Sequence, residues 1–283
     1  MPEIKLFENV LVPIDDSASS MMAQEVATII AKKTGSRVTV FHVMQEFMLG
    51  YGVAPEIGEL EGSVLQHADE TVNNALALFK EKGVSASAQT MRSSDPAESI
   101  LKFAEKNIDL IVMGVHGENE KDQYTLGSVT RKVITHVRVP TFITKKRSPL
   151  SSMLVCVDGS ERSTRAFEVA VRLAEKMGSR ITLLNVQDQR LQKASFKVVE
   201  ELADKIFSNT LSAVEKGRVK LEKKLEIGVP SDRIVEVAER GKYDLIVLGK
   251  RGLGKVKRFL LGSVSDDVIQ KAKTSVLVVP AET

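Results

Sequence analysis

Short apolar runs alternate with longer amphipathic segments along the chain, and the whole succession occurs twice. In the first half, runs rich in Val, Ile and Leu predict strands at residues 9–14, 37–43, 84–91, 110–114 and 141–145. Helical spacing of apolar positions predicts helices at residues 17–34, 60–82, 96–106 and 128–136. In the second half we expect strands near residues 152–157, 180–186, 219–226, 245–249 and 276–279, and helices near residues 163–177, 194–216, 231–240 and 263–271.

These elements predict an α/β fold of two tandem, doubly wound domains. Nearly continuous apolar strands are expected when helices cover both faces of a parallel sheet, here five-stranded in each domain. The third strand differs, because Val219, Leu221 and Leu225 alternate with Lys and Glu, which predicts an exposed edge. The basic stretch at residues 145–149 is expected to link domain 1, residues 1–146, to domain 2, residues 150–283.

The second half can be aligned with the first. Residues 10–17 match residues 153–160, an offset of 143, and the same offset relates His42 to Asn185. The offset then shortens to 134, since Pro96 matches Pro230. Domain 1 therefore carries an insertion after the second strand, which we place at residues 44–62. This segment could be a lid, an interface or a disordered loop.

Composition narrows the class of protein. The formal net charge of +3 is too small to predict nucleic-acid binding, and no run of about eighteen apolar residues predicts a membrane span. Residues 1–9 lack the basic start and apolar core of a signal peptide. Cys156 is the only cysteine, and the four histidines lack ligand spacing, so neither a disulfide nor a metal site is expected. We expect a cytoplasmic protein with no membrane or nucleic-acid partner.

A glycine pattern, Gly-x2-Gly-x9-Gly-Ser, follows the fourth predicted strand of each domain. Its two copies are Gly114, Gly117, Gly127 and Ser128, and Gly249, Gly252, Gly262 and Ser263. Glycine lets a backbone approach a ligand closely, and N–H groups at the start of the following helix can bind phosphate. The repeated pattern indicates a duplicated fold and, less directly, a duplicated nucleotide site.

Distinctive residues also mark the ends of the first two strands. Asp15 and Asp158 follow the first strand of each half, and Val43 and Val186 end the second. Doubly wound sheets bind ligands at the carboxyl ends of strands, where the strand order reverses. A carboxylate there can accept hydrogen bonds from a sugar hydroxyl or a base amine, while the glycine loop holds phosphates. This division of roles predicts a nucleotide.

With these residues the chain resembles the universal stress protein family in tandem form, over nearly all of both halves. The resemblance is carried by the strand-one endings at residues 12–17 and 157–160, by the runs at residues 127–130 and 262–265, and by the closing strand at residues 275–280. It implies a Rossmann-like fold of the adenine nucleotide α hydrolase-like kind. The full glycine pattern is similar to that of the ATP-binding branch.

The resemblance implies that ATP, or ADP or AMP, binds in domain 1 or in domain 2. Adenine would lie near the aspartate after strand one, and the run after the third glycine would hold the phosphate chain. The implied site residues of domain 1 are Pro13, Asp15, Val43, Met113, Gly114, His116, Gly117, Gly127, Ser128, Val129 and Thr130. Those of domain 2 are Cys156, Asp158, Val186, Leu248, Gly249, Arg251, Gly252, Gly262, Ser263, Val264 and Ser265.

Polar residues of this set also have structural interpretations. Asp15 and Asp158 could cap the first helix, because Asp158 and Glu161 have capping-box spacing. Ser128 and Ser263 are good N-cap residues, and a cap can contact phosphate as well.

The remaining site residues leave similar alternatives. Gly114 and Gly249 could serve only as tight strand exits. Cys156 lies in a core strand, where a thiol behaves as an inert small hydrophobe. His116 occupies the place that Arg251 has in domain 2, and we interpret it as a phosphate or ribose contact.

The two glycine loops differ in charge. Residues 250–258 carry five positive charges and no acid, whereas residues 116–122 are largely acidic. A triphosphate is strongly anionic, so the basic loop favours it and the acidic loop opposes it unless Mg²⁺ accompanies the phosphates. We therefore predict tighter ATP binding in domain 2, with domain 1 weaker, metal-dependent or specific for a less charged nucleotide.

The expected function is that of a stress-response regulator or sensor that responds to adenine nucleotide. No Walker A sequence occurs, and no carboxylate–histidine pair has the spacing for γ-phosphate chemistry, so catalytic residues are not assigned. The alternatives are a slow ATPase or nucleotide-dependent transferase, and an interaction scaffold with a vestigial site. The apolar fifth strands predict that the two halves pair within the chain as a built-in dimer, and a homodimer is expected beyond that.

Overall fold

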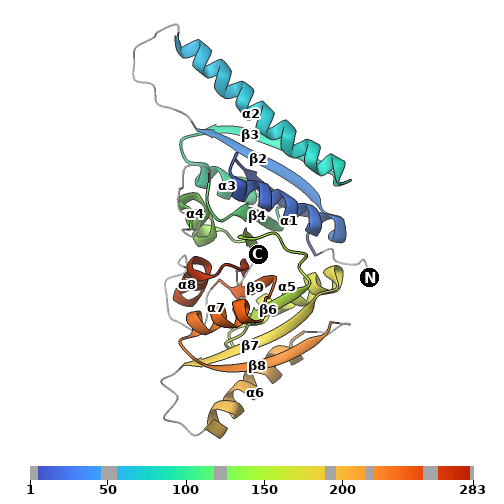
Figure 1. Cartoon of the computed structure of the whole chain (residues 1–283), viewed down its shortest axis with the longest axis vertical. Helices are drawn as coiled ribbons and strands as arrows, with labels where there is room; N and C mark the ends of the chain where they lie inside the picture. Colours follow the sequence, from blue (N-terminus) through green and yellow to red (C-terminus); the bar gives the residue numbers. More distant parts are fainter. Residues whose placement is uncertain are drawn as a thin grey trace.

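The computed structural model describes residues 6–45, 56–117, 126–188, 196–214, 219–250 and 261–280. Over these residues ten strands form one sheet, in the order β3-β2-β1-β4-β5-β10-β9-β6-β7-β8 (Figure 1). The first half contains β1 (Asn9–Ile14), α1 (Ala18–Thr34), β2 (Arg37–Gln45), α2 (Glu56–Glu81), β3 (Ala86–Ser93), α3 (Pro96–Ala104), β4 (Leu110–Gly114), α4 (Ser128–His136) and β5 (Thr141–Thr144). The second half contains β6 (Ser152–Cys156), α5 (Glu161–Met177), β7 (Arg180–Asp188), α6 (Phe196–Ser212), β8 (Leu221–Gly228), α7 (Pro230–Arg240), β9 (Leu245–Gly249), α8 (Ser263–Lys271) and β10 (Ser275–Val279). None of the helices in these ranges is long and apolar enough to cross a membrane.

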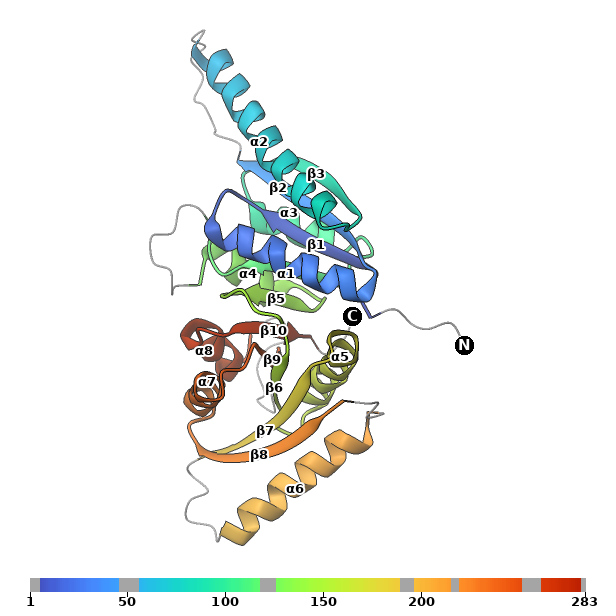
Figure 2. The ribbon, with the colours of Figure 1, turned by 45° about the vertical axis from the view of Figure 1, so that its right-hand side comes forward.

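The strands of each half are parallel and form the doubly wound sheet that the sequence predicts. β1 pairs with β2 on one side and with β4 on the other, so the strand order reverses between β1 and β4. Within the first half, α1 packs against α2 and α3 packs against α4, and helices cover both faces of the sheet (Figure 2). β3 and β8 form the two outer edges, which confirms the exposed position expected for the third strand.

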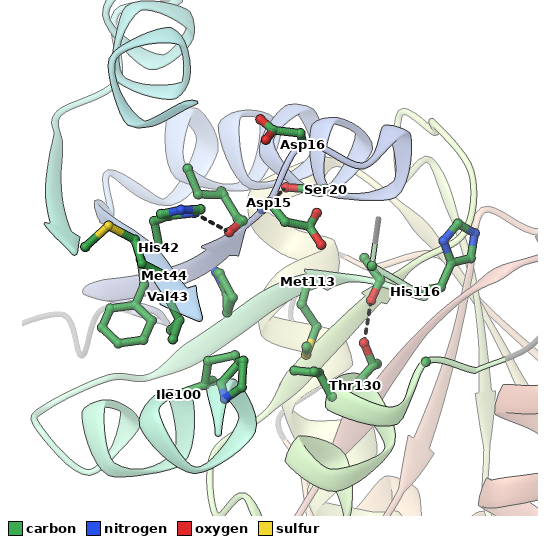
Figure 3. A pocket seen from close by; sticks show the side chains of 18 of the residues that line it. Asp15, Asp16, Ser20, His42, Val43, Met44, Ile100, Met113, His116 and Thr130 are labelled. Atoms are coloured by element: carbon green, nitrogen blue, oxygen red, sulfur yellow. Dashed lines mark hydrogen bonds between the residues drawn. The ribbon is translucent and has the colours of Figure 1, made fainter. Parts of the chain in front are cut away.

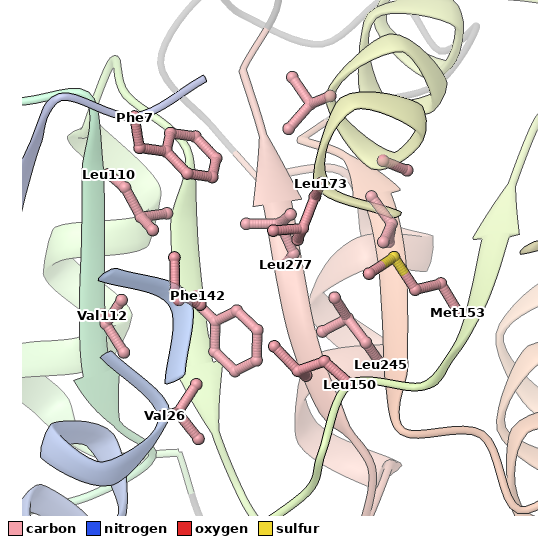
Figure 4. Close-up of a cluster of buried hydrophobic side chains, with 14 of the residues drawn as sticks. Phe7, Val26, Leu110, Val112, Phe142, Leu150, Met153, Leu173, Leu245 and Leu277 are labelled. Carbon is pink, nitrogen blue, oxygen red and sulfur yellow. The ribbon is translucent and has the colours of Figure 1, made fainter. Parts of the chain in front are cut away.

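The two halves join through β5 and β10, which pair antiparallel with Phe142 opposite Leu277. Phe142, Leu150, Met153 and Leu277 are fully buried in one apolar core that contains residues of both halves (Figure 4). The expected pairing of the fifth strands within one chain is therefore confirmed. It also covers two apolar edges that could otherwise pair with other chains.

The length of α2 is a clear difference between the halves. α2 has 26 residues, against 17 in α6, and begins at Glu56 rather than at the predicted Leu60. Residues 56–62 of the expected insertion are therefore helical, while residues 46–55 lie outside the described part of the chain. The long helix extends beyond the end of the sheet (Figure 1).

Two lysines connect the halves at helix C-termini. Lys145, directly after β5, donates from Nζ to the carbonyl oxygens of Ile269 and, at 2.7 Å, of Ala272 at the end of α8. Lys250, directly after β9, donates from Nζ to the carbonyl oxygen of Val137 at the end of α4, at 2.8 Å. Carbonyls at a helix C-terminus lack partners within the helix, and the helix dipole favours a cation there. Each half therefore helps to terminate a helix of the other.

We expect Lys145 to make the stability of the protein depend on pH. Burial lowers the pKa of Lys145 to about 8, whereas an unfolded lysine titrates near pH 10.4. Between these values the unfolded chain keeps a proton that the folded chain has released, so the free energy of unfolding rises with pH. Between about pH 7.5 and 10, the free energy of unfolding of the wild type should rise by about 2 kcal/mol relative to that of Lys145→Met. Urea unfolding at each pH measures this difference. Parallel pH profiles of the two proteins would contradict this expectation.

Candidate functional site

A cavity of about 510 Å³ lies at the carboxyl ends of β1, β2 and β4, where the strand order reverses (Figure 3). All the residues that the sequence analysis assigns to the domain 1 site line this cavity: Pro13, Asp15, Val43, Met113, Gly114, His116, Gly117, Gly127, Ser128, Val129 and Thr130. The fold thus brings together residues from separate segments of the sequence. The size of the cavity is typical of a small-molecule site.

One part of the cavity is apolar. The side chains there come from β2, α3 and β4, and they are Phe41, Val43, Met44, Pro96, Ile100 and Met113. In Figure 3, Val43 and Ile100 lie on the side opposite His116 and Thr130. A wall of this kind suits a flat ring, with polar groups of the ligand directed toward the other side.

An aspartate after the first strand of each half supports a helix cap without being the cap. Asp15 Oδ1 accepts from the N–H of Ser17 at 3.1 Å and from its hydroxyl at 2.6 Å, and Ser17 is the N-cap of α1. Asp158 binds Ser160, the N-cap of α5, in the same way at 3.0 and 2.7 Å. The interpretation of the two aspartates as caps is therefore wrong. Because Oδ1 of Asp15 is held in this turn, Oδ2 faces Gly117.

Gly114 and Gly117 permit two close backbone approaches. A Cβ on Gly114 would lie 2.2 Å from Ser19 Oγ and 2.8 Å from the Ser19 carbonyl carbon, so α1 could not pack against the end of β4. A Cβ on Gly117 would lie 2.8 Å from Asp15 Oδ2. Gly114 therefore has the structural role of a tight strand exit, and it lines the cavity as well.

The N-termini of α4 and α8 have no side-chain cap. Gly127 and Gly262 are the N-cap residues, and no side-chain cap hydrogen bond is made at either position. The interpretation of Ser128 and Ser263 as caps is therefore wrong, since each is the first residue of its helix. A helix start of this kind directs backbone N–H groups and the positive end of the helix dipole outward.

A hydroxyl fixes each of these helices to the end of the preceding strand. Thr130 Oγ1 donates to the carbonyl oxygen of Gly114 at 3.0 Å, and Ser265 Oγ donates to that of Gly249 at 2.9 Å. From the sequence, Thr130 and Ser265 are expected in the phosphate-binding run, and no sequence pattern predicts this bond. The bond holds the helix N-terminus in place relative to the sheet.

In domain 2, the described site residues occupy the corresponding places. Cys156 and Asp158 lie at and just beyond the end of β6, Val186 lies in β7, Leu248 and Gly249 end β9, and Gly262, Ser263, Val264 and Ser265 begin α8. Arg251 and Gly252 lie outside the described residues. Burial, and to a smaller extent Asp158, raise the pKa of the Cys156 thiol. A thiol of high pKa is a poor nucleophile, as expected of an inert core cysteine.

The aligned pair His42 and Asn185 joins the first two strands of each half. His42 Nδ1 lies 3.1 Å from the carbonyl oxygen of Ile14, and Asn185 Nδ2 donates to that of Val157 at 2.7 Å. Both bonds span the carboxyl ends of neighbouring strands. His42 also lines the cavity, at a position that the sequence analysis did not assign.

A polar cluster beside the cavity is not predicted from the sequence. His67 Nε2 lies 2.6 Å from Asp16 Oδ2, and Thr71 Oγ1 donates to Asp16 Oδ1 at 2.6 Å. Asp16 and His67 both line the cavity. Because the insertion overlaps the start of α2, the sequence alone could not show which residues of this helix would contact Asp16. Across the described ranges, no three His, Cys, Asp or Glu side chains are grouped to hold a metal ion.

Comparisons with known proteins agree with this architecture. A universal stress protein from Archaeoglobus fulgidus shares the fold, with a TM-score of 0.73 and 23% identity over 99% of this chain and 100% of that chain. A Pseudomonas aeruginosa protein named as a universal stress protein gives a TM-score of 0.70 and 17% identity over 97% of this chain and 93% of its own. A Staphylococcus aureus protein of the same name is 33% identical over 141 residues, which cover 46% of this chain and 84% of that protein.

The model of the universal stress protein family matches this chain twice. The matches cover residues 6–145 and residues 150–280. Each match contains one complete succession of β1 to β5 or β6 to β10. The chain therefore belongs to the universal stress protein family, as two family domains in tandem.

Proposed function

We propose that each half binds an adenine nucleotide, ATP or ADP or AMP, and that nucleotide occupancy changes the conformation or partners of a stress-response regulator. The observation that carries this proposal is the backbone at Gly127 and Gly262. Their φ values are −58° and −70° and their ψ values 148° and 146°, which other residues adopt freely. Backbone conformation therefore gives no reason for glycine, whereas a ligand lying against the backbone does.

The cavity of domain 1 supports this proposal because its groups follow the order of a nucleotide. The apolar wall suits adenine, and the fixed carboxylate of Asp15 suits a ribose hydroxyl or a base amine. The N-terminus of α4, with no side-chain cap, suits phosphate, because the helix dipole favours an anion there. Mg²⁺ would accompany the phosphates and reduce their charge.

We infer further that domain 2 binds ATP more tightly than domain 1. Residues 250–258 carry five positive charges, whereas residues 116–122 are largely acidic. A cationic loop raises the local concentration of an anionic ligand and stabilises it once bound.

The variants Gly127→Val and Gly262→Val test the proposal. Valine tolerates the backbone angles at both positions, and circular dichroism checks that each variant is folded. In calorimetric titrations with ATP, Gly262→Val should lose the tight phase and Gly127→Val the weak phase. Loss of the tight phase in Gly127→Val would reverse the ranking. Binding unchanged in both variants, or no adenine nucleotide released from freshly purified protein in mass spectrometry, would contradict nucleotide binding at these sites.

The alternatives make different predictions. A slow ATPase or nucleotide-dependent transferase predicts steady-state turnover above background, and a scaffold predicts no bound nucleotide in one or both halves. We further infer a cytoplasmic location and domain limits at residues 1–146 and 150–283. We also infer a homodimer, and light scattering in solution would test this oligomeric state.

A further inference from the structure

We propose that the domain 1 cavity selects an adenine compound with at most one phosphate group over ATP, and that His116 and Asp16 determine this selectivity. The inference rests on the proposed function, since it assumes that the cavity binds an adenine compound. What it adds is the preferred charge of the ligand, which is less negative than that of ATP.

Two carboxylates, those of Asp15 and Asp16, line the cavity, and Asp15 faces the glycine turn. Asp15 Oδ2 lies 2.8 Å from the position that a Cβ on Gly117 would occupy, so a phosphate chain near this turn meets a negative charge. Asp16 is held beside the cavity by His67 and Thr71, both at 2.6 Å, and cannot swing away without losing both contacts. Two nearby carboxylates oppose each added phosphate charge, while uncharged adenosine pays no such penalty.

His116 also lines the cavity, next to Gly117. Its Nδ1 is buried and, among the residues that the structure describes, has no hydrogen-bond partner. An imidazole offers one hydrogen bond from this nitrogen, which suits a ribose hydroxyl or a single phosphate. A guanidinium would offer several donors and a permanent charge, as a polyphosphate requires.

The second repeat differs at both positions. Gly159 stands where domain 1 has Asp16, and Arg251 stands where domain 1 has His116. Domain 2 thus keeps one of the two carboxylates, Asp158, and has an arginine in place of a histidine. The two changes act in the same direction, toward a more anionic ligand in domain 2 and a less anionic ligand in domain 1.

Hydrogen exchange on the full chain separates the two sites, because peptides covering α4 report on domain 1 and those covering α8 report on domain 2. At pH 8, above the ordinary titration range of histidine, adenosine and AMP should protect α4 at concentrations about tenfold lower than ATP. His116→Arg should lower the ratio of the ATP midpoint to the adenosine midpoint about tenfold. Asp16→Asn, which keeps the shape of the side chain, should act in the same direction. His136→Arg adds the same charge on the exposed last turn of α4 and should change neither midpoint.

The outcomes separate this inference from the proposed function. If ATP protects α4 at the same or a lower concentration than AMP, the selectivity is overturned and nucleotide binding stands. The same holds if adenosine binds but neither His116→Arg nor Asp16→Asn lowers the ratio of the ATP midpoint to the adenosine midpoint. If no adenine compound protects α4, the proposed function of domain 1 itself is wrong.

Discussion

Gly114→Ala is expected to lower the free energy of unfolding by about 3 kcal/mol. The new Cβ would lie 2.2 Å from Ser19 Oγ and 2.8 Å from the Ser19 carbonyl carbon. The hydroxyl could rotate away, but the backbone of α1 could not, so helix and strand must separate. Because Thr130 binds the carbonyl oxygen of Gly114, the start of α4 would move with the strand. Urea unfolding measures the loss, and weaker nucleotide binding in domain 1 should accompany it.

Gly62→Ala is the matched control for Gly114→Ala. Gly62 lies exposed in α2, and a Cβ there would meet nothing within 4 Å. Alanine favours the helix over glycine, so this variant should be more stable by about 0.5 to 1 kcal/mol. Equal effects of the two substitutions would show that the contact with Ser19 is not what requires glycine at position 114.

Much of the fold could be predicted because apolar patterning is a local signal. The apolar runs give the strands their places, and the alternation in residues 219–226 predicts the edge position of β8. The apolar character of residues 141–144 and 276–279 also predicts that β5 and β10 meet. Each of these signals lies within a few neighbouring residues.

The sequence was less informative about which polar and small residues contact one another. The capping-box spacing of Asp158 and Glu161 suggested an aspartate cap, but the serine between them caps the helix and the aspartate binds that serine. The contact of Gly114 with Ser19 depends on how closely α1 packs on β4. The contact of His67 with Asp16 depends on the rotation of α2 after an insertion. The contacts of Gly114 and of His67 require the packing of helices on the sheet, which no local pattern specifies.

The candidate sites of the two halves share some features and differ in others. Both halves hold the helix N-terminus with a hydroxyl on the fourth strand, at Thr130 and Ser265, and both hold the strand-one aspartate on a serine cap. These bonds depend on the backbone plan and are duplicated with it. At the positions of Asp16 and His116, in contrast, the second half has Gly159 and Arg251.

Phe142→Ala is expected to lower the free energy of unfolding by about 3 to 5 kcal/mol. Phe142 is fully buried in β5 and faces Leu277 of β10 in the antiparallel pair. The core around it contains residues of both halves, among them Val112 of β4 and Leu245 of β9 (Figure 4). The cavity left by the ring would remove contacts from both sides of the junction. Hydrogen exchange should therefore show lost protection in β4 and in β9.

Phe103→Ala removes a ring of the same size away from the junction and serves as the control. Phe103 lies in α3, where it is partly exposed. Its ring packs against Phe41, with the ring centroids 4.8 Å apart. Phe103→Ala should lower the free energy of unfolding by less than half as much as Phe142→Ala, since less apolar surface returns to water. Hydrogen exchange should show reduced protection in the first half alone. If Phe142→Ala also reduced protection only in the first half, the halves would be independent units that share an edge. Lost protection in both halves would show that the core across β5 and β10 stabilises the tandem chain as one folding unit.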